Sequence, residues 1–157
     1  MVIAKMDVSQ LLSMWELLAE MEGVCARLAC ERMSASERAE LKRSHNDAQR
    51  IADANDMDAW KGANLTFHEV LYAGSRNPYL RQEILRMRAR TGAYRDHAFA
   101  ALGNIGASWD QHADVLAAIL GKDPVAAHGT MVKHLSPGQG ARGFASFLAA
   151  LPKQLLD

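Results

Sequence analysis

The sequence has no excess of charge of either sign, because 18 Lys and Arg residues are matched by 18 Asp and Glu residues. A protein that binds nucleic acid on its own usually carries a basic excess for affinity to phosphates, although a neutral total still allows a local basic patch. No apolar run approaches the ~20 residues of a membrane-spanning helix, and residues 1–10 lack the apolar core of a signal peptide. We therefore expect no membrane segment.

Cysteine is also scarce, with only Cys25 and Cys30 in 157 residues. The two lie five positions apart in a segment of helical periodicity, and such residues point to different sides of a helix. We therefore expect free thiols, which are typical of a reducing, cytoplasmic setting. A chain of 157 residues with 49% hydrophobic residues suits one globular domain with its own core.

No segment alternates polar and apolar residues as a β-strand would, whereas apolar residues recur at three- and four-residue steps nearly throughout. The sequence therefore predicts an all-α protein, an antiparallel bundle of six or seven helices. The first helix should end near Met33. Capping and breaking signals divide the rest of the chain. Ser34 or Ser36 caps a charged, solvated helix that runs to about Ala54, a break at Asn55-Asp56 precedes a helix to Gly74, and Asn77-Pro78 starts a helix over residues 78–99. After a loop at 103–106, Ser108 caps the next helix, Asp123-Pro124 starts another that ends at Leu135, and a last amphipathic stretch covers residues 144–151.

Three of the six histidines lie on apolar helix faces, each in a different predicted helix: His68, His112 and His134. An imidazole in an apolar interior needs a partner for each ring nitrogen. Each ring could find a separate hydrogen bond in the core, or the three could share one divalent cation, as happens in helical bundles. Periodicity leaves both interpretations open.

The other three histidines are predicted to have structural roles. His45 lies among charged residues, which indicates a solvated face, and His97 follows Arg95-Asp96 near a helix end, where an exposed or capping role fits. His128 shares a predicted helix with His134 but lies six residues away, so the two side chains should point apart.

Four blocks of sequence occur in order between residues 8 and 136: WELLAEMEG and ARLA at 15–29, NLTFHEVL and SRNPYL at 64–80, QHADVLAAI and GKDP at 111–124, and MVKHL at 131–135. Together they resemble the FCD domain, the C-terminal effector-binding domain of the FadR branch of GntR-type transcription regulators. The resemblance implies a helical, homodimeric sensor that holds a divalent metal on three histidines and one acidic residue. A small carboxylate effector would bind beside the metal.

Carried over to this chain, the implied metal ligands are His68, His112 and His134, with Asn64 at the acidic position. Asparagine offers a neutral carbonyl oxygen, which is a weaker ligand than a carboxylate. The metal's charge would stay uncompensated, which favours an anionic effector as a further ligand, or else weakens metal retention. Imidazole-rich ligation suits zinc or nickel.

A second departure from the family is Leu18, where many FCD domains have an arginine that can face the effector. Arginines of the fourth predicted helix are candidate substitutes, and Tyr94 is a further pocket candidate. We select Arg88, Tyr94 and Arg95 as the candidate effector-binding residues, with Arg86 and Arg90 as further arginines of the same helix. Periodicity does not decide which of them face inward.

Regulators of this type contact DNA through an N-terminal winged helix-turn-helix, which the residues before the first helix are too few to form. We interpret residues 1–7 as a remnant of a linker or wing strand, 8–151 as the FCD-like domain and 152–157 as a tail. The chain would be either a truncated regulator or a stand-alone sensor, and would contact DNA only through the missing domain. A metal-dependent enzyme using the same three histidines is the alternative function. It would need a general base beside the metal, and we expect Glu69 and Asp114, which neighbour ligands in the sequence, to point elsewhere. A structural helical module with buried histidines is the third.

Overall fold

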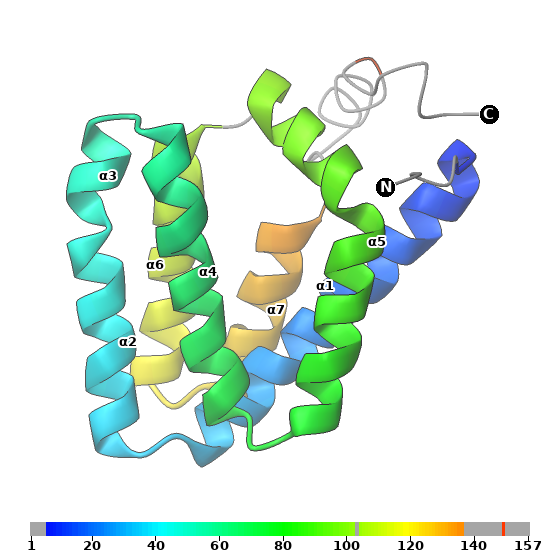
Figure 1. Ribbon diagram of the computed structural model, residues 1–157. Helices are drawn as coiled ribbons and strands as arrows, with labels where there is room; N and C mark the ends of the chain where they lie inside the picture. Colours follow the sequence, from blue (N-terminus) through cyan, green and yellow to red (C-terminus); the bar gives the residue numbers. More distant parts are fainter. Residues whose placement is uncertain (1–5, 103, 137–148, 150–157) are drawn as a thin grey trace.

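The computed structural model describes residues 6–102, 104–136 and 149, and these include seven helical segments (Figure 1). Their bounds are α1 (Val8–Arg32), α2 (Ala35–Asp47), α3 (Gln49–Asp53), α4 (Met57–Gly74), α5 (Pro78–Leu102), α6 (Ile105–Leu120) and α7 (Pro124–Leu135). The all-α bundle predicted from periodicity is confirmed. The predicted helix at 144–151 and the proposed boundaries at either end fall largely outside the described residues.

Short-range capping explains where most helices begin. The Ser34 hydroxyl accepts from the Glu37 backbone N–H, and the Glu37 carboxylate accepts from the Ser34 N–H, which forms a capping box at the start of α2. Asn77 caps α5, which begins at Pro78, and Asp123 caps α7, which begins at Pro124. These starts agree with the sequence prediction, because caps depend on residues within one turn of each other.

Three local predictions were wrong. Asn104, not Ser108, caps α6, because its side chain accepts from the Ala107 N–H and starts the helix one turn earlier. The predicted second helix is two segments, since α2 ends at Asp47 and α3 begins at Gln49. His45 is only 5% exposed, because its ring stacks on Trp109 of α6 with centroids 4.4 Å apart.

Helix α1 is the central element, because it packs against α4, α5, α6 and most extensively α7. In Figure 1, α2, α3, α4 and α6 form one side of the bundle, and α7 lies between α6 and α1. The close approach of α1 and α7 requires Gly23: a Cβ there would lie 2.6 Å from Val132 Cγ2 and 3.0 Å from His128 Cδ2. No described helix is both long and apolar enough to cross a bilayer.

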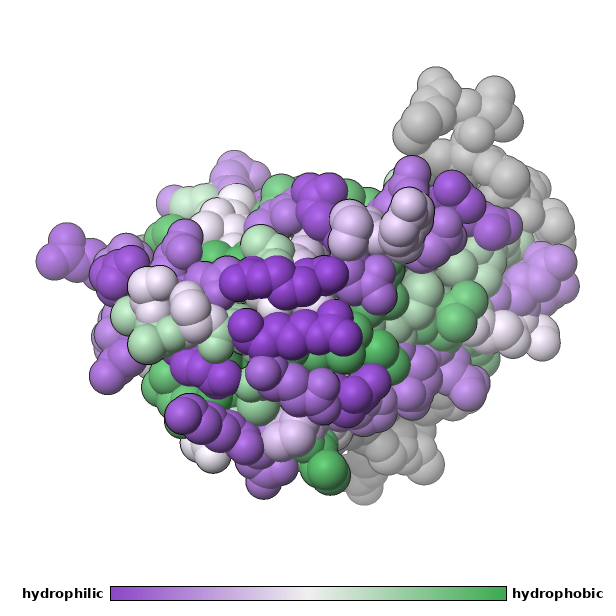
Figure 2. Space-filling model, turned by 90° about the horizontal axis from the view of Figure 1, so that it is seen from below, coloured by the Kyte–Doolittle hydropathy of each residue, from purple (hydrophilic) through white to green (hydrophobic). Residues whose placement is uncertain are grey.

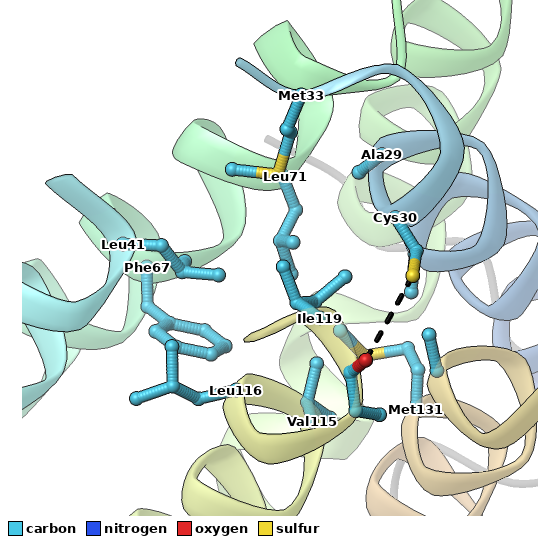
Figure 3. Packing of buried hydrophobic residues seen from close by; sticks show 13 residues of the cluster. Ala29, Cys30, Met33, Leu41, Phe67, Leu71, Val115, Leu116, Ile119 and Met131 are labelled. Atoms are coloured by element: carbon cyan, nitrogen blue, oxygen red, sulfur yellow. Dashed lines mark hydrogen bonds between the residues drawn. The ribbon is translucent and has the colours of Figure 1, made fainter. Parts of the chain in front are cut away.

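The largest buried cluster joins residues of α1, α2, α4, α6 and α7 (Figure 3). Phe67, Leu71, Ile119 and Met131 are each at most 1% exposed, and complete burial of such side chains stabilises a fold by about 1.5–3 kcal/mol each. The Cys30 thiol lies 3.8 Å from the Ala118 carbonyl oxygen within this cluster. The core thus fixes the relative positions of the four helices that carry the polar groups described next.

The turn end of the bundle, seen from below, is covered largely by hydrophilic side chains with scattered hydrophobic spots (Figure 2). Arg76 and Glu37 pair there, with Nη1 and Oε1 2.6 Å apart. A hollow at the same end is lined by residues of the α1–α2 and α6–α7 turns and their flanks, and none of the inward histidines belongs to it: Cys30, Glu31, Met33, Ala35, Arg38, Lys122 and Pro124.

Candidate metal centre

Three helices bring His68 (α4), His112 (α6) and His134 (α7) together inside the bundle. Each offers one ring nitrogen, and these three atoms all lie within 4.8 Å of one another. The Nε2 atoms of His112 and His134 are 3.1 Å apart. His68 is 0% exposed and His112 2% exposed, while His134 is partly buried. The structure therefore brings together the three side chains that the sequence predicted to face inward.

A buried carboxylate sets the orientation of His68. Nδ1 of His68 lies 3.2 Å from Oε2 of Glu22, a residue of α1 that is itself only 1% exposed. The opposite ring nitrogen, Nε2, is buried and has no hydrogen-bond partner among the described residues. The imidazole is thus anchored on one side and presents an unsatisfied nitrogen on the other.

The other two rings are also held from behind. The Nδ1 atom of His134 lies 2.8 Å from Oε1 of Gln111, which directs its Nε2 toward His112. The ring of His112 stacks on Phe67, with centroids 4.1 Å apart and an interplanar angle of 6°. Trp60 adds a second stacked contact at 5.6 Å. These contacts restrict the rotation of both rings.

All three imidazoles are neutral near pH 7. Burial, reinforced by the neighbouring His134 and His68, lowers the pKa of His112 well below 6.5. Burial and His68 lower the pKa of His134 to about 3. Burial also lowers the pKa of His68, against the opposing effect of Glu22. Neutral imidazole is the form that binds a metal.

This donor set fits a divalent cation. The Nε2 atoms of His112 and His134 lie 3.1 Å apart, and Nε2 of His68 has no hydrogen-bond partner among the described residues. Unless one of these nitrogens carries a proton, none of them can donate a hydrogen bond to another. A cation between the three would satisfy all of them at once. Three nitrogen ligands match zinc or nickel, and leave at least one coordination position open.

Asn64 lies one helical turn before His68 on α4 and is partly buried. No hydrogen bond joins its side chain to any other described residue. Its predicted place as a fourth ligand stays a prediction.

The FCD-domain family model matches residues 13–137. The chain belongs to the FCD-domain family. Among solved structures it is similar to E. coli McbR/YncC, with 21% sequence identity, a TM-score of 0.75, and coverage of 90% of this chain and 69% of that one. At this identity the likeness shows the fold alone. No curated protein matches the sequence. The FCD domain is the effector-sensing part of GntR-family regulators, so the family resemblance read from the sequence is confirmed.

The sequence did not reveal the role of Glu22 in this FCD domain. Its Oε1 accepts from the Tyr72 hydroxyl at 2.6 Å and from Nε of Arg88 at 2.6 Å. Burial acts to raise the pKa of Glu22, but His68, the charge of Arg88 and the Tyr72 hydroxyl outweigh it and leave the pKa below its usual range. Its partners lie 46 to 66 positions away, so no local pattern could have indicated them.

The four arginines of α5 that the sequence analysis singled out divide into two groups. Arg86 and Arg90 are exposed, and Arg86 pairs with Glu83. The Arg88 side chain is 14% exposed and points inward to Glu22, with Nη2 and Oε1 2.5 Å apart. Arg95 also lies on the inner side, where it donates to the Thr91 hydroxyl and the Arg88 carbonyl oxygen, each at 3.1 Å. Burial, followed by repulsion from Arg88, lowers the pKa of Arg95 to about 10, so it stays charged at neutral pH.

Arg95 has no carboxylate partner among the described residues, whereas Arg88 is engaged by Glu22. Tyr94 is completely buried, and its hydroxyl accepts from the Met6 backbone N–H at 3.2 Å. Leu18, which stands where many FCD domains have arginine, is 0% exposed and packs with Tyr72 and Ile84. An apolar contact thus occupies that position of α1.

His45 and His128 do not belong to the cluster. His128 pairs with Glu20 at 3.2 Å on the surface, so its predicted separation from His134 fits. The side chain of His97 lies outside the described residues.

Proposed function

We propose that this FCD domain binds one divalent metal ion, zinc or nickel, through His68, His112 and His134, and senses a small carboxylate effector beside it. The convergence of the three ring nitrogens within 4.8 Å carries the proposal. Asn64, one turn from His68, is the proposed fourth protein ligand.

The charges around the cluster favour an anionic effector. The three imidazoles and Asn64 are neutral, and the negative charge of Glu22 is compensated by Arg88. A divalent metal and Arg95 would therefore leave a buried excess of positive charge, which is costly unless an anion compensates it. A carboxylate could coordinate the metal and receive hydrogen bonds from Arg95, with Tyr94 and Arg88 as further candidates for the pocket wall.

In a complete regulator, effector binding would reposition helices and change the spacing of two DNA-binding heads. We propose a cytoplasmic homodimer that contacts DNA through an N-terminal domain. The enzyme alternative needs a base beside the metal, but Glu69 pairs with Arg81 at 2.7 Å and Asp114 is exposed. These observations favour the sensor.

Metal binding is tested by loading the purified chain with Zn²⁺ or Ni²⁺ and measuring stoichiometry by native mass spectrometry and affinity by chelator competition. We expect one ion per chain, loss of binding in His112→Gln and His134→Gln, and unchanged binding in the surface variant His128→Gln. Equal affinity in wild type and His112→Gln, or no binding by the wild type, contradicts the proposal.

A further inference from the structure

We propose that Glu22 is a positioning residue that selects the metal-binding tautomer of His68. In that tautomer Nδ1 carries the proton and donates it to Glu22, so that Nε2 faces the other two histidines with a free lone pair. The tautomer itself is a property of the metal-free protein, and only its effect on affinity rests on the proposed metal binding.

Two contacts compete at Nδ1 of His68 and demand opposite tautomers. Oε2 of Glu22 lies 3.2 Å away and can only accept, so it requires an Nδ1–H. Nη2 of Arg88 lies 3.3 Å away and can only donate, so it requires an unprotonated Nδ1 and hence an Nε2–H. The second arrangement would aim a proton into the space between the three rings and block a cation.

The hydrogen bonds of Glu22 decide between the two. Both Tyr72 and Arg88 donate to the same carboxylate oxygen, Oε1. The other oxygen, Oε2, has His68 as its hydrogen-bond partner among the described residues. An unprotonated Nδ1 would leave a buried, charged oxygen facing a lone pair. A hydrogen bond to an ionised acceptor is also stronger than one to a neutral ring nitrogen, so Nδ1–H is favoured.

The orphaned nitrogen agrees with this assignment. Nε2 of His68 is buried without a hydrogen-bond partner in the described part of the chain. A histidine that ligates a metal has, before the ion binds, an unprotonated ring nitrogen whose lone pair faces the other ligands. Carboxylates that hold a ligating histidine from behind also raise its basicity, and removing them typically weakens metal binding about 10- to 100-fold.

The substitution Glu22→Gln gives a directional test. Tyr72 and Arg88 both donate at the Oε1 position, so the amide oxygen of glutamine is required there. The amide NH₂ then occupies the Oε2 position and donates toward His68, which forces Nδ1 to accept. The variant should therefore convert His68 to the Nε2–H tautomer without changing side-chain size.

We would record ¹⁵N–¹H correlation spectra of metal-free protein labelled at histidine, with His68 assigned by its loss in His68→Gln. The wild type is expected to show protonated Nδ1 and unprotonated Nε2, and Glu22→Gln the reverse. Glu20→Gln is the matched control: it lies on the same helix, its carboxylate pairs with the surface residue His128, and it should leave the His68 spectrum unchanged. A wild-type His68 protonated at Nε2 overturns the proposal, even if Glu22→Gln does not fold.

The second readout is Zn²⁺ affinity by chelator competition. We expect Glu22→Gln to bind 10- to 100-fold more weakly and Glu20→Gln to match the wild type. Unchanged affinity together with an unchanged tautomer in Glu22→Gln overturns the role of Glu22. If the wild type bound no metal but showed the Nδ1–H tautomer that glutamine reverses, the proposed function would fail while the assignment of Glu22 stood.

Discussion

His112 and His134 direct their Nε2 atoms at each other across 3.1 Å from the neighbouring helices α6 and α7. Gln111, which holds His134 from behind, is the chain neighbour of His112, so α6 supplies one candidate ligand and the orienting group of another. A small rotation of α6 would therefore disturb two of the three rings. This coupling makes the cluster sensitive to helix movement, which is what a sensor requires.

The buried histidines should make the metal-free protein acid-sensitive. Their folded pKa values lie below the value of the unfolded chain, and that of His134 is about 3. The unfolded chain therefore binds more protons between pH 6.5 and 3, so stability is lost as the pH falls through 6.5. We expect the free energy of unfolding in urea to drop by at least about 1 kcal/mol from pH 7.5 to 5.5. The drop should be smaller in His134→Gln than in His128→Gln; an equal drop in both contradicts the argument.

Replacing Asn64 by aspartate should tighten metal binding. A carboxylate one turn from His68 would add negative charge to a set of neutral ligands, and we expect roughly tenfold tighter Zn²⁺ binding, equal to about 1.4 kcal/mol. Chelator competition measures the change. Asn46→Asp, on the exposed surface of α2, is the control for net charge. The same affinity in both variants would show that Asn64 lies outside the coordination sphere.

Arg95 should contribute to carboxylate binding but not to metal binding. We expect Arg95→Met to weaken the binding of succinate to zinc-loaded protein at least tenfold in calorimetry, because a charge-assisted hydrogen bond is lost. Zn²⁺ affinity should not change. The exposed Arg90→Met variant should behave like the wild type. If Arg95→Met binds succinate as well as Arg90→Met does, another group holds the anion.

Two glycine substitutions should have opposite effects on stability. Gly23→Ala places a Cβ 2.6 Å from Val132 Cγ2 between α1 and α7, and we expect a loss of about 1–3 kcal/mol from overpacking. Gly62→Ala, within α4, meets nothing within 4 Å and should gain about 0.5–1 kcal/mol from helix propensity. Urea unfolding at pH 7.5 measures both. Equal shifts of the same sign would refute the proposed closeness of α1 and α7.

The sequence by itself determined most of the helix limits and the fold class. Caps such as Asn77 before Pro78 and Asp123 before Pro124 act within a single turn, so their residues are close in the sequence. Helical periodicity also placed His68, His112 and His134 on inward faces. Asn104 was missed because Gly103 and Gly106 flank it, and this composition predicted a loop that ends at Ser108.

Only the tertiary structure decided how the histidines are held and which charges face them. The burial of His45 depends on Trp109, 64 positions away, and the role of Glu22 on residues 46 to 66 positions away. Arg88 and Arg95 point inward, whereas Arg86 and Arg90 are exposed. This difference depends on which face of α5 packs against α1. Such contacts are set by helix packing rather than by local propensity, so no pattern along the chain could have revealed them.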